Sequence, residues 1–291
     1  MKLPAFGYAS PSSLSDAIAL LAAARGTAKP IAGGQSLIPV LAFRLAKPAL
    51  LVDLRNVPGL DRIRIGADGV RLGAMVRWCD IEADDRLRCA HPLLVDAVSH
   101  VAHYQIRNRG TVGGSLAHAD PVAELPGVAV ACEAELTLMG PQGSRVVSAS
   151  DFFRGALSTV LTDDELIVEV RLPAWPNSRR WAFEEFARRR GDFALAGIVA
   201  FYDRDASGRA TNTRLVAIGT AQYPRRLRRA EAALDGSPVD EQAIERAARA
   251  ARLEVEPASD LHASADYRRS LVETLAERAL LEARARADQA S

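Results

Sequence analysis

The segment IAGGQSLIPV (31–40) limits the possible fold of this chain more than any other stretch. Its two adjacent glycines separate a short strand candidate from a helix candidate over residues 37–46, and ALLVDL (49–54) then has the pattern of a buried strand. A strand, a glycine turn, a helix and a second strand make a βαβ unit, in which the two strands run parallel. We therefore expect a parallel sheet at the N-terminus.

The composition is that of an ordinary globular protein and excludes several functional classes. Of 291 residues, 48% are apolar and 25% charged, and the net charge is +1. A chain of this length has room for two domains, and its near-neutral charge does not indicate binding to nucleic acid. The longest apolar runs fall short of the roughly 20 residues that cross a bilayer. AIALLAAA (17–24), preceded by Asp16, predicts an amphipathic helix rather than a signal peptide. We expect a cytoplasmic protein without a transmembrane segment.

The cysteines do not form a metal-binding or disulfide pattern. Cys79, Cys89 and Cys132 are widely spaced and include no C-x-x-C pair. Three such thiols cannot supply the four ligands of a zinc or iron–sulfur site, and an odd, irregular set argues against a disulfide framework. We expect reduced thiols and no metal ligands.

Breaker residues and hydrophobic periodicity divide the chain into three parts. Residues 1–55 contain the parallel unit, and residues 56–175 mix short strands with a helix predicted over 91–105. Pro176 and Asn177 mark a boundary. Residues 176–291 then contain two strands, predicted over 194–203 and 213–221, and two long helices, predicted over 239–251 and 264–287.

A second glycine pair occurs in a similar local context in GTVGGSLAH (110–118). Glycine allows an anion to approach the main chain closely, and a following helix N-terminus offers free N–H groups. The hydroxyls of Ser36, Thr111 and Ser115 could add donors. Neither segment matches the Walker or G-x-G-x-x-G pattern. Each pair alone is typical of a plain turn, whereas the two together could clamp a diphosphate.

Several longer motifs resemble the flavin-binding medium subunit of the molybdenum hydroxylases, the carbon monoxide dehydrogenase and xanthine dehydrogenase family. They are AGGQSLIP (32–39), LLVDLRNVPGL (50–60), IRNRGTVGGSLAHADPVAELP (106–126), FARRRGDFALAG (186–197) and DLHASADYRRSL (260–271). The resemblance implies an α+β fold. A PCMH-type FAD-binding domain would comprise two subdomains, 1–55 and 56–175, and a smaller C-terminal domain, 176–291, would hold an antiparallel sheet and helices. FAD would lie between the first two, with its pyrophosphate on the two glycine loops.

The resemblance also implies which residues contact FAD. Main-chain contacts are expected from both loops: Ile31, Ala32, Gly33, Gly34, Gln35, Ser36 and Leu37, then Thr111, Val112, Gly113, Gly114 and Ser115. Ser115 stands where many relatives have Asn, so its main-chain contact is expected more firmly than a side-chain one. Further contacts are expected from Asp120 and Glu124 with polar groups, from Phe193 near the flavin ring, and from Val101 and Ile167 as apolar lining. Asp120 is also suited to cap a helix before Pro121, and Phe193, Val101 and Ile167 are equally suited to the core.

The implied function is electron transfer within a larger enzyme. In the family, a large subunit with molybdopterin oxidises the substrate, a small subunit carries two [2Fe–2S] clusters, and FAD passes electrons to an external acceptor. This chain would be the FAD subunit of a dimer of heterotrimers, would contribute no catalytic residue, and would not hydroxylate anything alone. The sequence indicates neither the substrate nor the acceptor.

Two alternatives remain open at this point. A stand-alone FAD oxidoreductase would need an acid or base facing the flavin, and copurification with a cluster-bearing subunit distinguishes it. A regulatory subunit that has lost FAD would not need its glycine pairs. His118 could tune the flavin or be structural, and the arginine runs 188–190 and 225–229 could bind phosphate, contact a partner or be solvated surface.

Overall fold

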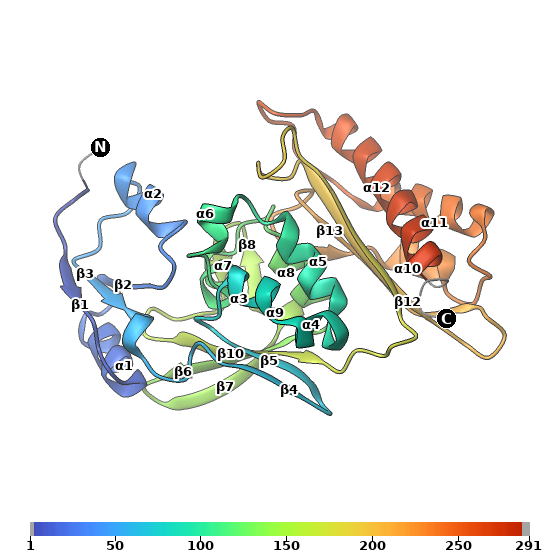
Figure 1. The fold of residues 1–291 in the computed structure, drawn as a ribbon. Coiled ribbons are helices and arrows are strands. Elements are labelled where there is room, and N and C mark those ends of the chain that lie inside the picture. The colour runs from blue at the N-terminus through green and yellow to red at the C-terminus, as the bar shows by residue number, and fades with distance from the viewer. Residues whose placement is uncertain (1–2, 287–291) are drawn as a thin grey trace.

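The computed structural model describes residues 3–286, which form three units that follow one another in chain order (Figure 1). Each unit is built on its own sheet of three, five or four strands, and a two-stranded ribbon completes the set. The α+β architecture predicted from the sequence is confirmed. The boundaries at residues 55 and 175 stay predictions. Within residues 3–286, no helix combines the length and apolar character needed to cross a membrane.

The first unit is the predicted parallel sheet. Its strands lie in the order β1 (Gly7–Ala9), β3 (Leu50–Asp53) and β2 (Ala28–Ile31), and both neighbouring pairs are parallel. Helix α1 (Leu14–Ala23) begins at Ser13, whose hydroxyl accepts the N–H of Asp16. Helix α2 (Leu37–Ala42) is shorter than the predicted 37–46, because Arg44 adopts the left-handed region at φ 60° and ends the helical path.

The second unit packs helices on one side of an antiparallel sheet (Figure 1). The strand order is β4 (Ile63–Gly66), β5 (Gly69–Gly73), β10 (Leu166–Pro173), β6 (Glu135–Gly140) and β7 (Gly143–Ser148). The helices are α3 (Trp78–Ala83), α4 (Asp85–Ala90), α5 (Pro92–His100), α6 (Tyr104–Arg107), α7 (Val112–His118), α8 (Glu124–Ala131) and α9 (Ala149–Phe152). The short strands β8 (Phe153–Gly155) and β9 (Ser158–Thr159) complete it. The short helix η1 (Leu54–Asn56) precedes it, and Leu54 packs in the core of the first unit.

The helix predicted over 91–105 is interrupted in the structure. Helix α5 ends at His100, and Ala102 has φ 40°, so the chain turns before α6 begins at Tyr104. Alanine has no preference for this region, and the helical periodicity therefore gave no sign of the break.

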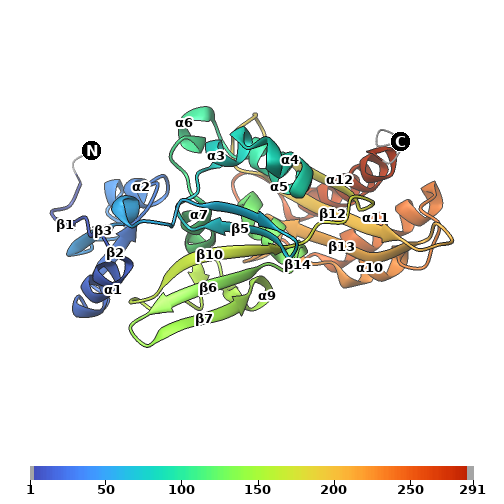
Figure 2. The same ribbon diagram turned by 60° about the horizontal axis from the view of Figure 1, so that its bottom comes forward.

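The third unit is an antiparallel sheet covered by helices on one face (Figure 2). Its strands are β11 (Arg180–Phe186), β12 (Ala196–Arg204), β13 (Ala210–Ile218) and β14 (Arg225–Arg226), and its helices α10 (Arg228–Leu234), α11 (Glu241–Glu254) and α12 (Ala265–Ala285). Alternate residues of β12 face opposite ways. Ile198 shares a core with α11 and α12, whereas Val199 belongs to the core of the second unit. One face of the third unit's sheet is therefore part of the second unit's core, whereas the opposite face forms a separate core with the helices.

The connection between these two units is itself packed. The ring centroid of Trp175 lies 4.6 Å from that of His91 and 5.4 Å from that of Phe201. The guanidinium of Arg179 lies over both Trp175 and Phe201, at 4.9 and 4.5 Å from their centroids. Arg179 also forms an ion pair with Asp203 at 2.8 Å. The connection is therefore held in place by stacking at both ends.

Candidate functional site

The two glycine loops lie directly against each other. A Cβ atom added to Gly33 would lie 2.0 Å from the carbonyl oxygen of Arg109 and 3.0 Å from the Cα atom of Gly110. A Cβ added to Gly114 would lie 3.9 Å from that of Ala32. Segments about eighty residues apart in the chain thus meet through their main chains, and a side chain at position 33 would separate them.

The first loop presents free main-chain donors. Strand β2 ends at Ile31, and the chain turns through Gly34, whose φ of 74° favours glycine. The side-chain amide of Gln35 donates to the carbonyl of Gly33 at 3.1 Å and fixes the turn. Within residues 3–286, no acceptor is paired with the N–H groups of residues 33–36, and the Ser36 hydroxyl caps no N–H group of α2. These groups are available to a ligand.

The second loop differs from the first, although the sequence suggested a similar context. Gly113 and Gly114 lie inside the first turn of α7 rather than ahead of the helix. The N–H groups of Val112 and Gly113 donate to the carbonyls of Val76 and Ala74, at 2.9 and 2.8 Å. The two N–H groups that follow both donate to Thr111, one of them to its hydroxyl at 3.2 Å.

Hydroxyl groups are therefore the donors that the second loop still offers. Among the described residues, no acceptor takes the hydroxyl hydrogen of Thr111 or of Ser115. The first loop thus contributes main-chain N–H groups and the second contributes O–H groups, both of which suit an anion.

A carboxyl group with a raised pKa begins the next helix. Burial raises the pKa of Glu124 to about 8, and the nearby charge of Glu185 adds to this shift, whereas His100 opposes it. The Nδ1 atom of His100 lies 3.5 Å from a carboxylate oxygen of Glu185, which raises the pKa of the imidazole. Asp120 accepts the N–H of Val122 at 3.1 Å in a turn ahead of α8, whose N-cap is Ala123, so Asp120 does not cap this helix. At neutral pH the Glu124 carboxyl holds a proton.

The three apolar residues expected to contact FAD differ in burial. Val101, at the end of α5, and Ile167, on β10, are both buried in the core of the second unit. Phe193 is 76% exposed in the turn between β11 and β12, so the view of it as a core aromatic is wrong. The turn also carries Arg188, Arg189 and Arg190, all exposed.

Some neighbours of the loops were not identified from the sequence. A Cβ on Gly113 would lie 2.6 Å from that of Ala74, and the small residue directly after β5 was a usable signal. Arg109 and Gly110 directly precede the second loop, but nothing in the sequence predicted that their main chain would contact Gly33. Likewise, no pattern predicted that His103 would pack against Gly191, where an added Cβ would lie 2.3 Å from the ring.

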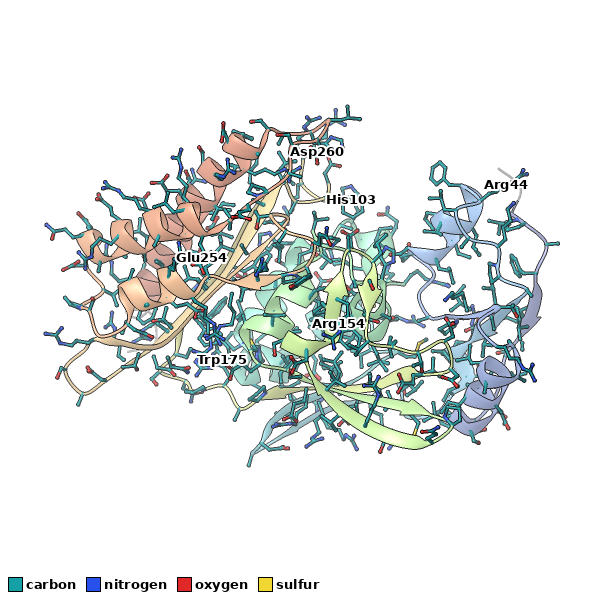
Figure 3. All side chains as sticks on the ribbon, turned by 180° about the vertical axis from the view of Figure 1, so that it is seen from behind. Arg44, His103, Arg154, Trp175, Glu254 and Asp260 are labelled. Carbon is teal, nitrogen blue, oxygen red and sulfur yellow. The ribbon has the colours of Figure 1, made fainter. Side chains whose placement is uncertain are left out.

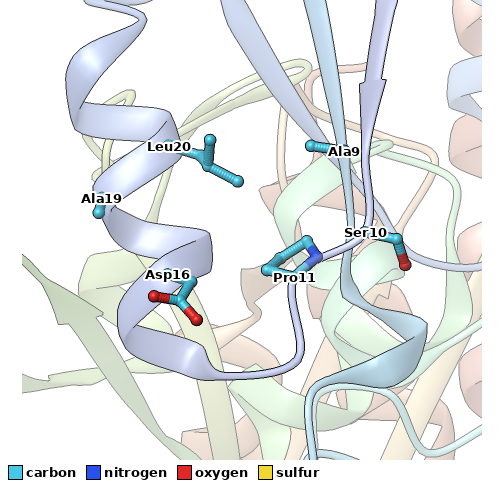
Figure 4. Close-up of a pocket in the computed structure, with 6 residues that line it drawn as sticks. All are labelled: Ala9, Ser10, Pro11, Asp16, Ala19 and Leu20. Atoms are coloured by element: carbon cyan, nitrogen blue, oxygen red, sulfur yellow. The ribbon is translucent and has the colours of Figure 1, made fainter.

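A surface pocket beside α1 is not part of this site (Figure 4). It is lined by Ala9, Ser10, Pro11, Asp16, Ala19 and Leu20. The Asp16 carboxylate already accepts the hydroxyl of Ser13 at 2.6 Å, so the pocket offers few free polar groups to a ligand.

Comparison with known proteins assigns the family. Residues 4–175 match the family described as FAD binding domain in molybdopterin dehydrogenase. The chain belongs to the FAD-binding medium subunits of the molybdenum hydroxylases. Residues 181–283 match the CO dehydrogenase flavoprotein C-terminal domain, so the two matches cover the whole medium-subunit architecture.

The relatives are similar to this medium subunit over their entire length. The nicotine 6-hydroxylase medium subunit of Paenarthrobacter nicotinovorans is 42% identical over 98% of this chain and 100% of its own. A carbon monoxide dehydrogenase structure from Hydrogenophaga pseudoflava superimposes with a TM-score of 0.95 at 38% identity, covering 98% and 99% of the two chains. Quinoline 2-oxidoreductase of Pseudomonas putida 86 gives 0.94 at 41% identity, covering 99% of both chains. Like these relatives, the chain is a flavoprotein subunit of a molybdenum-containing oxidoreductase.

Proposed function

We propose that this chain is the electron-exit subunit of a multi-subunit molybdenum hydroxylase. Electrons would reach its FAD from the [2Fe–2S] clusters of a small partner subunit and leave to an external acceptor. A large partner subunit would carry the molybdopterin centre, and the whole enzyme would be a cytoplasmic dimer of heterotrimers that binds no nucleic acid. The supporting observation is the medium-subunit architecture over the full chain, together with only three scattered cysteines, which cannot hold two clusters.

The contact between the two glycine loops carries the assignment of the cofactor site. The free N–H groups of residues 33–36 and the hydroxyls of Thr111 and Ser115 are donors of the kind that a diphosphate requires. The close approach of Gly33 to Arg109 holds these donors on one site. FAD, when bound, supplies the exchange between one-electron and two-electron transfer.

Other residues would bind and orient the rest of the cofactor. We assign main-chain or apolar contacts to Ile31, Ala32, Gly34, Gln35, Leu37, Val101 and Ile167, and polar contacts to Asp120 and Glu124. Val112, Gly113 and Gly114 would pack against the cofactor without donating to it, because their N–H groups are paired within the protein. Because its raised pKa keeps Glu124 protonated at neutral pH, its carboxyl can donate as well as accept a hydrogen bond. Phe193, exposed on its turn, would cover the flavin ring and exclude water.

The test uses the chain purified with its partner subunits. We expect one FAD per chain, bleaching of its absorption when substrate is added to the complex, and no substrate hydroxylation by the chain alone. Hydroxylation by the isolated chain, or a complex that is fully active without FAD, would contradict the proposal.

A further inference from the structure

The turn that carries Phe193 is tied to other segments at several points. Residues 187–195 form the hairpin between β11 and β12, and the N–H of Leu195 closes its base by donating to the carbonyl of Phe186 at 2.7 Å. At its tip, Gly191 has φ 86° and packs closely against the imidazole of His103, which belongs to the second unit. The hairpin thus bridges the third unit and the FAD-binding domain.

A single buried arginine of α12 connects this hairpin with the FAD domain. Arg268 is 5% exposed, and one guanidinium nitrogen donates to the carbonyl of Leu195 and, at 3.3 Å, to that of Gly219. The N–H of Gly219 in turn donates to the carbonyl of Pro121 at 2.9 Å. Pro121 follows Asp120 directly, so Arg268 connects the end of the Phe193 hairpin with the segment of the polar candidates.

The other side of the guanidinium is held by an acidic turn. A second nitrogen of Arg268 pairs with Asp260 at 2.6 Å. Asp260 also accepts the N–H groups of His262 and Ala263, at 2.8 and 2.9 Å. The hairpin returns to this turn, because Arg188 donates to the carbonyl of His262 at 2.8 Å. Figure 3 shows Asp260 and His103 on the same edge of the molecule, at the two ends of this network.

The arrangement suits the terminal nitrogens of an arginine, although its buried Nε atom has no hydrogen-bond partner among the described residues. The planar guanidinium sends donors in several fixed directions, here toward two carbonyls and one carboxylate, whereas an ammonium group is a point charge. Such charge-assisted hydrogen bonds are stronger than neutral ones.

We propose that Arg268 is a positioning residue, which holds the 187–195 hairpin against the FAD-binding domain and so keeps Phe193 over the flavin. The part that concerns the flavin rests on the proposed function. Arg268 itself would touch neither the cofactor nor the acceptor and would act through Leu195 and Gly219.

The test compares Arg268→Met with a matched control, Arg269→Met, in the assembled complex. Arg269 is the next residue and forms only an exposed pair with Asp266 at 2.7 Å. The first readout is tryptic cleavage at Arg188–Arg190 under native conditions, which does not depend on FAD. We expect cleavage about tenfold faster in Arg268→Met, because the released hairpin opens more often, and wild-type rates in the control.

The second readout reports on the flavin. We expect iodide to quench flavin fluorescence more strongly in Arg268→Met, and KM for the electron acceptor to change while reduction of the flavin by substrate keeps its rate. If Arg268→Met does not assemble, Asp260→Asn replaces it, since it removes the charge that orients Arg268 and leaves the arginine in place.

The outcomes separate the two proposals. Cleavage and quenching equal to those of the Arg269→Met control would overturn the role of Arg268. Faster cleavage with unchanged quenching would overturn the part of the proposal that concerns Phe193 and the flavin. A complex that contains no FAD would instead contradict the proposed function, and the tryptic rates would still decide whether Arg268 holds the hairpin.

Discussion

Replacing Gly33 by alanine is the sharpest perturbation of the contact between the two glycine loops. The added methyl would lie 2.0 Å from the Arg109 carbonyl oxygen, whereas ordinary contacts begin at 3.4 Å, so one main chain must move by about 1.4 Å. Gly33 does not have a left-handed φ, so the effect comes from the contact and not from backbone strain. Overpacking of this kind costs about 1–3 kcal/mol.

This cost should appear as lost FAD affinity, because the shift moves the donors of one loop away from those of the other. A loss of about 1–3 kcal/mol corresponds to a roughly 5- to 150-fold weaker affinity. FAD occupancy of the assembled complex, measured against free FAD concentration, gives this ratio. Gly155→Ala is the control, since its methyl would meet Oε1 of Gln222 at 3.4 Å and Cβ of Ser158 at 4.0 Å, both ordinary contact distances. Equal FAD affinity in the two variants would refute the reasoning.

Three further outcomes are expected. Thr111→Ala removes the cap of the Gly114 N–H and should lower the free energy of unfolding by about 1 kcal/mol, with Thr111→Ser retaining it; equal denaturant midpoints for both variants would argue against the cap. The pKa of Glu124 is raised to about 8, so the free energy of unfolding should fall as pH rises from about 4.5 to 8. Glu124→Gln should therefore become more thermally stable than wild type as pH rises through this range. Parallel plots of melting temperature against pH for the two proteins would show that the pKa of Glu124 is not raised. Trp175→Ala removes the stacking with His91 and Phe201 and should lower the free energy of unfolding by about 2–4 kcal/mol, as measured by thermal unfolding. An unchanged melting temperature would mean that this stacking does not stabilise the chain.

Local patterns were sufficient where structure depends on neighbouring residues. The parallel sheet followed from the strand, glycine turn, helix and strand of residues 27–54, and β2 and β3 pair in parallel. The helix predicted over residues 17–24 is found as α1. In contrast, the break after His100 depends on the backbone of Ala102, a residue that favours helix, so no local signal marked it.

The glycine pairs show the same limit within the site. The two glycine pairs indicated that another group approaches the main chain closely at both places. Which donors each loop offers, however, depends on hydrogen bonds to residues distant in the sequence. The carbonyls of Val76 and Ala74 take the N–H groups of Val112 and Gly113, which leaves the second loop with hydroxyl donors. The tie between Arg268 and Leu195 is equally distant in the sequence, and it could be found only in three dimensions.

The most direct test of the central claim is an experimental structure of the FAD-loaded complex. The account predicts the FAD pyrophosphate between the N–H groups of residues 33–36 and the hydroxyls of Thr111 and Ser115. A pyrophosphate bound elsewhere on this chain, with the two loops still in mutual contact, would contradict it.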